Sequence, residues 1–164
     1  YNVTGTILDI LKSSGLPDSC HITIILGGQS PWLEKIKQQA LTMPWETSLE
    51  IDVSDMARLM SESDLAIGAA GSTTWERCCL GLPTLMILLA ENQRKIAESL
   101  GRCGAALVFK EPSSSEFRVK LQQAIIDYIE HPEKLTEMSN IAANITDGMG
   151  VERVIQKILG LGAL

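Results

Sequence analysis

The residues best suited to chemistry lie between Asp64 and Gln93, in the stretch DLAIGAAGSTTWERCCLGLPTLMILLAENQ. A short apolar run ends there and an expected helix begins, and the residues at that point are Gly71, Ser72, Thr73 and Thr74. A glycine lacks the Cβ that blocks close approach, and the first N–H groups of a helix attract anions. The spacing therefore predicts a cradle for a diphosphate. An ordinary helix-capping turn explains the same residues, and the stretch taken alone fits that interpretation better.

Three further polar residues flank this turn. Glu76 falls in the first turn of the same helix, where its carboxylate is able to accept two hydrogen bonds from the vicinal hydroxyls of a ribose. The alternative is favourable placement beside the helix dipole. Asn92 and Gln93 follow the next apolar run and begin the next helix, so we expect them at the same edge of a sheet. At that edge Gln93 is suited to form a hydrogen bond with a phosphate or a sugar hydroxyl. The alternative is that it is simply a polar residue at the start of a helix.

Two more loops are expected at this edge. Asp52–Met56 follows an apolar run, and its exposed backbone, with Val53 and Met56 nearby, is suited to reading the edge of a base. A capped helix start is the stronger interpretation of that loop in isolation. Gly27 and Gly28 end another strand, and a glycine pair before a Pro-initiated helix is also plain turn chemistry.

Apolar periodicity indicates the elements that position these loops. Five short strands are expected at 21–26, 48–53, 64–69, 84–89 and 105–109. Helices are expected at 3–14, 31–40, 54–60, 73–80, 92–100, 113–130, 133–144 and 151–159. Strands alternating with helices predict an α/β fold, a doubly wound, Rossmann-like parallel sheet in a single domain of residues 1–164. The chain begins on a helix, so we expect the strand before Val3 to lie upstream in a longer protein; the alternative is that this helix simply starts the domain.

Composition excludes several classes of protein. The 164 residues are 45% hydrophobic with a net charge of −6, which disfavours binding to nucleic acid or to an anionic membrane. No apolar run approaches the roughly 20 residues of a membrane span. A secretion signal is not apparent, and four cysteines show no metal-ligand spacing, so they are expected to be reduced thiols in the cytoplasm.

The sequence offers no evident catalytic base. His21 begins a strand and His131 ends a helix, and neither belongs to a recognisable catalytic motif. Paired carboxylates, a Ser/His/Asp arrangement and a metal cluster are likewise not readable from the spacing. We therefore expect a binding edge without catalytic residues, metal ligands or a cofactor.

The stretch from Asp55 to Gln93, with AGSTTWERCCLGLP followed by Asn92-Gln93, resembles a known family. It is similar to the nucleotide-binding half of the UDP-sugar hydrolase of pseudaminic acid synthesis. It resembles more remotely the N-acetylglucosaminyltransferase that forms lipid II. Both have the two-domain GT-B architecture, so the resemblance, which runs from Asn2 to about Phe109, implies the C-terminal UDP-binding half of such a fold. The implied partners are a UDP-sugar and the N-terminal domain of the same protein.

The resemblance also implies roles for individual residues. Glu76 matches the glutamate that holds the ribose hydroxyls, and Gly71–Thr73 match the glycine-rich turn at the diphosphate. Val53 and Met56 match the positions near the uracil, and Asn92 and Gln93 match the polar pair facing the sugar and phosphate. The hydrolase's catalytic histidine belongs to its N-terminal half, which nothing in this chain matches.

Three functions are compatible with these residues. The first is the UDP-binding half of a UDP-sugar hydrolase in nonulosonic acid synthesis. The second is the same half of a glycosyltransferase of surface or spore-coat polysaccharide synthesis. The third is a non-catalytic module that binds nucleotide sugars. In each case we expect the chain by itself to bind UDP without turning over a UDP-sugar.

Overall fold

The computed structural model describes residues 1–160 and places them in two compact units. Unit 1 is formed by Tyr1–Met56 and Phe109–Glu133, and unit 2 by Ala57–Val108 and the chain from Lys134 onward. The last four residues of the predicted 1–164 domain lie outside the described residues. A single domain stays a prediction.

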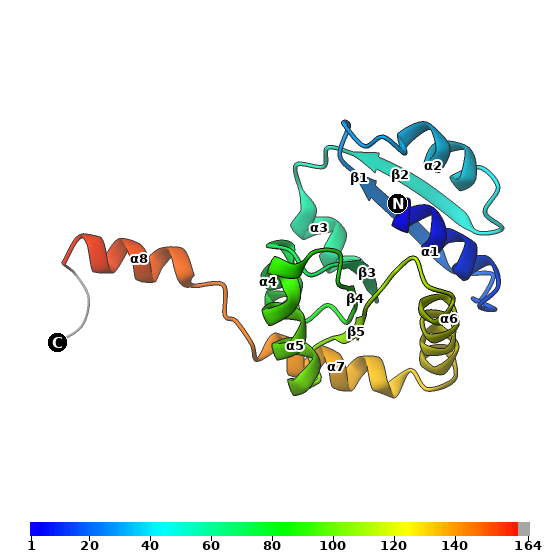
Figure 1. Ribbon diagram of the computed structural model, residues 1–164. Coiled ribbons are helices and arrows are strands. Elements are labelled where there is room, and N and C mark those ends of the chain that lie inside the picture. The colour runs from blue at the N-terminus through cyan, green and yellow to red at the C-terminus, as the bar shows by residue number, and fades with distance from the viewer. Residues whose placement is uncertain (161–164) are drawn as a thin grey trace. The chain divides into compact units, whose positions relative to one another are not determined.

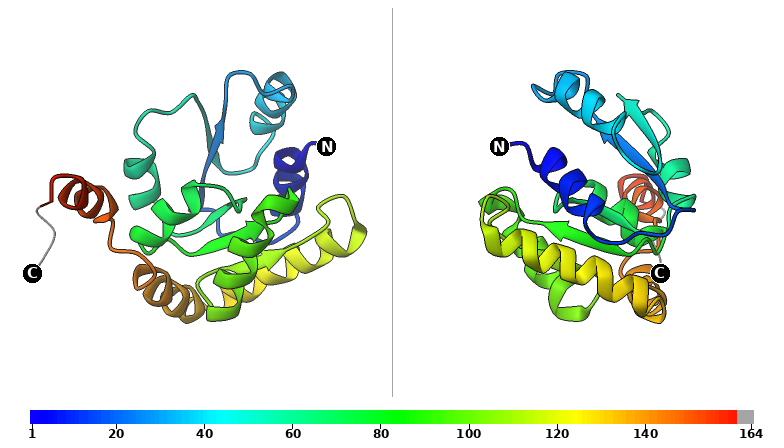
Figure 2. Two further views of the ribbon diagram at one scale, coloured as in Figure 1. Left: turned by 60° about the vertical axis from the view of Figure 1, so that its left-hand side comes forward. Right: turned by 90° about the vertical axis from the view of Figure 1, so that its right-hand side faces the viewer.

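Unit 1 combines a small sheet with three helices. Its elements are α1 (Val3–Lys12), β1 (His21–Leu26), α2 (Leu33–Ala40), β2 (Glu46–Ile51) and α6 (Ser115–Glu130) (Figure 1). The two strands pair in parallel, with His21 opposite Glu46 and Leu26 opposite Ile51. Helix α1 packs against α2 and α6, and α2 packs against β2. Two further views of the ribbon are given in Figure 2.

The helices of unit 1 form where caps and apolar stripes indicate them. The side chain of Asn2 caps α1 by accepting a hydrogen bond from the Gly5 amide at 3.0 Å. Ser114 caps α6 in the same way, accepting from the Phe117 amide at 3.1 Å. Ile36 of α2 is completely buried, and Phe117 packs edge-on against Phe109 with 6.2 Å between ring centroids. Burial of the apolar face of each helix, rather than intrinsic helix propensity, stabilises such short helices.

Unit 2 is built around a three-stranded sheet. Its elements are α3 (Met56–Ser61), β3 (Ala66–Ala69), α4 (Thr73–Cys79), β4 (Thr84–Ile87), the 3₁₀ turn η1 (Glu91–Gln93), α5 (Arg94–Cys103), β5 (Leu107–Phe109), α7 (Glu133–Ala143) and α8 (Gly150–Ile158). The strand order is β3-β4-β5, and β3 and β4 run parallel, with Ala69 opposite Ile87. All four residues of β4 are buried, as its uninterrupted apolar run predicts.

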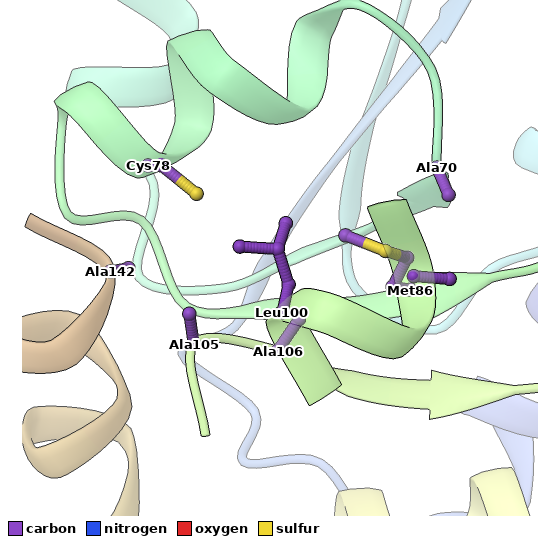
Figure 3. Close-up of a cluster of buried hydrophobic side chains, with 8 residues drawn as sticks. Ala70, Cys78, Met86, Leu100, Ala105, Ala106 and Ala142 are labelled. Carbon is purple, nitrogen blue, oxygen red and sulfur yellow. The ribbon is translucent and has the colours of Figure 1, made fainter. Parts of the chain in front are cut away.

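Small side chains fill the core of unit 2 (Figure 3). Cys78 of α4, Met86 of β4 and Leu100 of α5 pack together, and Ala142 of α7 belongs to the same cluster. Burial raises the pKa of the Cys78 thiol, while its neighbour Cys79 is exposed. The two adjacent cysteines therefore lie on different faces of α4. Cys78 acts as a small apolar side chain.

The end of α4 is fixed by a left-handed glycine. Gly81 has a φ of +63°, and a Cβ there would lie 3.2 Å from Ser139 Oγ and 3.3 Å from Ala143 of α7. The Gly81 amide donates to Cys78 O at 2.9 Å, and the Leu82 amide donates to Arg77 O at 2.9 Å. This closing turn holds α4 against α7 and so fixes the direction in which its first turn points.

The predicted α/β class is confirmed, but the single five-stranded sheet is not observed. The strands form two separate sheets, β1-β2 and β3-β4-β5. Strands adjacent in sequence are neighbours in space for only about two-thirds of such pairs. Apolar runs show that strands are buried but not which strands pair, and β2 and β3 do not pair.

Helix α8 differs from the other α-helices in burying none of its residues, and it exposes Val151, Val154 and Ile158. The loop before it is closed by Asp147, which accepts a hydrogen bond from the Met149 amide at 3.1 Å and pairs with Arg153. Hydrogen bonding from Arg153 lowers the pKa of the Asp147 carboxyl to about 2. Within residues 1–160, none of the helices has both the length and the apolar character needed to cross a membrane.

Candidate functional site

The turn between β3 and α4 presents unused backbone donors. The Thr74 amide donates to Gly71 O at 3.1 Å, and the Trp75 amide donates to Ser72 O at 3.2 Å. In the described part of the chain, the amides of Ser72 and Thr73 have no such acceptor. The Ser72 hydroxyl makes no capping hydrogen bond. The turn is therefore not an ordinary capped start, and its N–H groups are available to an anion.

Gly71 leaves open space beside this turn. A Cβ built on it would meet no heavy atom within 4 Å, and its backbone is outside the left-handed region. The packing of the chain therefore does not require glycine at this position. The space suits a ligand that approaches the backbone closely.

Thr74, which the sequence predicted as a UDP-binding residue, has a buried side chain. Its residue exposure is 1%, and its Oγ1 accepts a hydrogen bond from Arg77 Nη2 at 3.2 Å. Position 74 lies in the first turn of α4 on the face that packs inward, where Cys78 also lies, so the helical period buries it. This side chain supports the turn from within, and any contact to a ligand would involve its neighbours.

Arg77 is a site residue that sequence reasoning missed. Although charged, it is 5% exposed, and it donates to Ala69 O at 2.6 Å and to Thr73 O at 3.4 Å. Desolvation lowers the pKa of its guanidinium. The signal that marks it is helical spacing, because Arg77 lies three residues after Thr74 and beside Cys78, on the buried face of α4.

Glu76, Asn92 and Gln93 lie on the same sheet edge as the turn. Because β3 and β4 are parallel neighbours, the turn after Ala69 and the segment after Ile87 leave the sheet at the same end. Glu76 and Asn92 are exposed, and Gln93 is half-buried. The side-chain oxygen of Gln93 accepts from the Leu89 amide at 3.1 Å, so its amide nitrogen is the group left to donate to a ligand.

The other two predicted loops belong to unit 1. Val53 and Met56 follow β2 and are half-buried. The four loops expected at one edge are thus divided, two in each sheet. In unit 1 the Gly28 amide donates to Asp52 Oδ1 at 2.7 Å, and Asp52 has a φ of +50°. The carboxylate of the chain itself therefore occupies the glycine loop that follows β1.

Neither histidine is placed as a catalytic base. His21 begins β1, at the opposite end of the strand from Gly27–Gly28, and its Nε2 lies 2.7 Å from Glu46 Oε2. His131 caps the end of α6 and lies 3.5 Å from Glu133. Both pairs are exposed. Among residues 1–160, no group of three or more histidine, cysteine or acidic residues is arranged to hold a metal ion.

The chain is similar to several known proteins. Residues 6–156 match the family described as the glycosyltransferase family 28 C-terminal domain. The spore coat polysaccharide biosynthesis protein SpsG of Bacillus subtilis is 32% identical over 87 residues, covering 53% of this chain and 25% of that protein. The UDP-N-acetylglucosamine--N-acetylmuramyl-(pentapeptide) pyrophosphoryl-undecaprenol N-acetylglucosamine transferase of Moorella thermoacetica is 25% identical over 167 residues, covering 96% of this chain and 44% of the relative.

A solved structure shows the same fold. The crystal structure of Acinetobacter baumannii MurG matches with a TM-score of 0.74 and 22% identity, covering 94% of this chain and 44% of that one. The likeness confirms the Rossmann-like α/β fold. The chain spans less than half the length of each of these relatives. None of the three is named as a hydrolase, so the predicted hydrolase has no support from them.

Proposed function

The chain belongs to the family of glycosyltransferase family 28 C-terminal domains, and on that premise we propose that it is the UDP-sugar-binding half of a GT-B glycosyltransferase. The family match over residues 6–156 is the observation that carries the proposal. Two of the relatives are named for polysaccharide biosynthesis and for transfer of N-acetylglucosamine from its UDP derivative. The proposed setting is synthesis of a surface or spore-coat polysaccharide in the cytoplasm.

The β3–α4 turn is the proposed diphosphate site. Its unused Ser72 and Thr73 amides and the open space at Gly71 support this role. Amides fixed at the start of a helix stabilise a phosphate in the ground state and the added charge on departing UDP. In a transferase this is the leaving-group half of the reaction. The acceptor and the group that activates it would come from the N-terminal domain, which we propose as the partner of this chain.

Glu76 is the proposed ribose ligand. It is exposed in the first turn of α4, within the same sheet edge as the diphosphate turn, and a carboxylate is able to bond two adjacent hydroxyls. Asn92 and the Gln93 amide nitrogen are proposed to face the sugar and phosphate. Val53 and Met56 are proposed to lie near the uracil.

Calorimetric titration with UDP tests this proposal. Glu76→Ala is expected to weaken binding by about 1.5–3 kcal/mol, the usual range for hydrogen bonds to a charged group. Glu116→Ala is the matched control, because Glu116 is also an exposed glutamate in the first turn of a helix and is assigned no role in binding. The control is expected to keep its UDP affinity within twofold.

Two outcomes would count against the proposal, and they are distinct. A folded wild-type chain that does not bind UDP at millimolar concentration would contradict the proposed function as a whole. Equal UDP affinities for wild type and Glu76→Ala would contradict the role of Glu76 alone.

A further inference from the structure

The Arg77 guanidinium lies beneath the β3–α4 turn and holds it at both ends. Nη2 donates to Ala69 O, where β3 ends, and Nε donates to Thr73 O, where α4 begins. Nη2 also donates to Thr74 Oγ1. Gly71 and Ser72 lie between these anchors, so a single side chain fixes both sides of the segment whose amides are unused.

Strand β3 makes room for this side chain. A Cβ built on Gly68 would lie 2.9 Å from Arg77 Nη1, which is closer than a Cβ comes to a non-bonded heavy atom in folded proteins. Glycine at position 68 therefore admits the guanidinium rather than serving a left-handed turn, since its φ is not positive. The strand and the helix are shaped around the same charged group.

Stability alone does not account for an arginine here. The three acceptors are two backbone carbonyls and a hydroxyl, and none of them carries a negative charge. Desolvation is the larger effect on Arg77 and lowers its pKa, although the neighbouring Glu76 carboxylate favours the charged guanidinium. Burying a cation whose hydrogen-bond acceptors are all uncharged is costly, and an apolar side chain of similar volume is often at least as stabilising. The retained charge is best explained by an anion that arrives from outside.

We propose that Arg77 is a positioning residue for a nucleoside diphosphate: it fixes the Ala69–Thr74 turn and gives its unused amides a positive potential from below. The inference rests on the proposed function and deepens it. Because the group is buried, its charge is screened less by water and salt than that of a surface lysine. It would act on the diphosphate without touching the base or the ribose.

Comparing UDP with uridine isolates this role. The affinities of the 164-residue chain for both ligands are measured by NMR titration in wild type and in Arg77→Gln. We expect UDP binding to weaken by tenfold or more while uridine binding changes by less than twofold. Arg77→Lys, which keeps the charge but loses the planar fork, is expected to restore part of the UDP affinity.

Two further variants guard against a trivial loss of folding. Gly68→Ala keeps the arginine but displaces its guanidinium, so it is expected to weaken UDP binding by threefold or more with uridine unaffected. This result stands even if Arg77→Gln does not fold. Arg102→Gln removes an exposed arginine of α5 in the same unit and is expected to change neither affinity.

Two results in Gly68→Ala and in any folded Arg77 variant would overturn the inference. Either UDP and uridine lose affinity equally, or neither ligand loses affinity. If Arg77→Lys binds UDP no more tightly than Arg77→Gln does, the positive charge of residue 77 does not contribute to UDP binding. Failure of wild type to bind UDP would instead contradict the proposed function, and this inference with it.

Discussion

The glycine-containing turns that follow β1 and β3 are alike in their place between a strand and a helix and opposite in electrostatics. Each follows a strand of a parallel sheet and precedes a helix. After β1, the Gly28 amide is bound at 2.7 Å by the carboxylate of Asp52. After β3, the amides of Ser72 and Thr73 lack an acceptor within residues 1–160, and the buried cation of Arg77 lies behind them.

This difference shows that a glycine turn does not by itself make an anion site. In unit 1 a negative group from the neighbouring strand end satisfies the turn and would repel a phosphate. In unit 2 the nearby charged group is the positive Arg77 of the following helix, and the outward amides of the turn keep no acceptor within the described residues. The deciding residues, Asp52 and Arg77, both lie outside the glycine segments.

Placing a carboxylate beside the β3–α4 turn, as Asp52 lies beside the turn after β1, is expected to have the largest effect, a loss of UDP affinity. Ser72→Asp places a carboxylate on the open amides, and repulsion of the diphosphate is expected to cost about 2–3 kcal/mol, roughly thirtyfold or more in UDP affinity. Ser72→Asn, of nearly the same size but uncharged, is the control. Calorimetry on both variants checks the effect. A UDP affinity in Ser72→Asp equal to that of Ser72→Asn would show that the diphosphate is held elsewhere.

Removing the carboxylate from the unit 1 turn is expected to have a smaller effect, on stability. Asp52→Ala loses the hydrogen bond to Gly28 and leaves a side chain that disfavours a φ of +50°, so we expect unfolding to become easier by about 1–2 kcal/mol. Asp52→Asn keeps an acceptor oxygen and tolerates this backbone, and should lose about half as much. Urea unfolding measures both. Identical values for the two variants would contradict the structural role of the side chain.

The loop before α8 is also closed by a carboxylate, that of Asp147. Changing its partner is expected to have the smallest effect of the three, a shift in one pKa. Hydrogen bonding from Arg153 lowers the pKa of Asp147 to about 2 from its ordinary 3.8. A lowered pKa means that this loop's stabilising contribution is complete above the ordinary value and is lost as the pH falls towards 2. The carboxyl carbon of Asp147, followed by NMR against pH, is expected to titrate near 2 in wild type and closer to 3.8 in Arg153→Gln. Coinciding curves would contradict the pairing.

The sequence predicted the elements well because they follow from local patterns. The strand at 21–26 matches β1 exactly in its bounds, and the long helix expected at 113–130 corresponds to Ser115–Glu130. Predicted bounds differ from the observed ones by up to three residues at the ends of both strands and helices: 64–69 narrows to Ala66–Ala69, and 92–100 becomes Arg94–Cys103. Apolar periodicity and capping residues carry this information. Strand pairing does not, which is why one expected sheet is found as two.

The candidate site was predictable only in part. Gly71, Ser72 and Glu76 were predicted as site residues because they follow an apolar run and begin a helix, and their role in binding stays a prediction. The burial of Thr74 and of Arg77 was not predicted, because which side of α4 faces inward depends on packing against the sheet. A charged residue is expected at the surface unless its helical neighbours are known to be buried.

The most direct test of the comparison follows the backbone amides themselves. In the isotopically labelled chain, UDP is expected to shift the amide signals of Ser72 and Thr73 well beyond the shifts caused by uridine. The Gly28 signal is expected to respond equally to the two ligands, because its amide is already bound by Asp52. A diphosphate-specific shift at Gly28, with none at Ser72 or Thr73, would contradict the account.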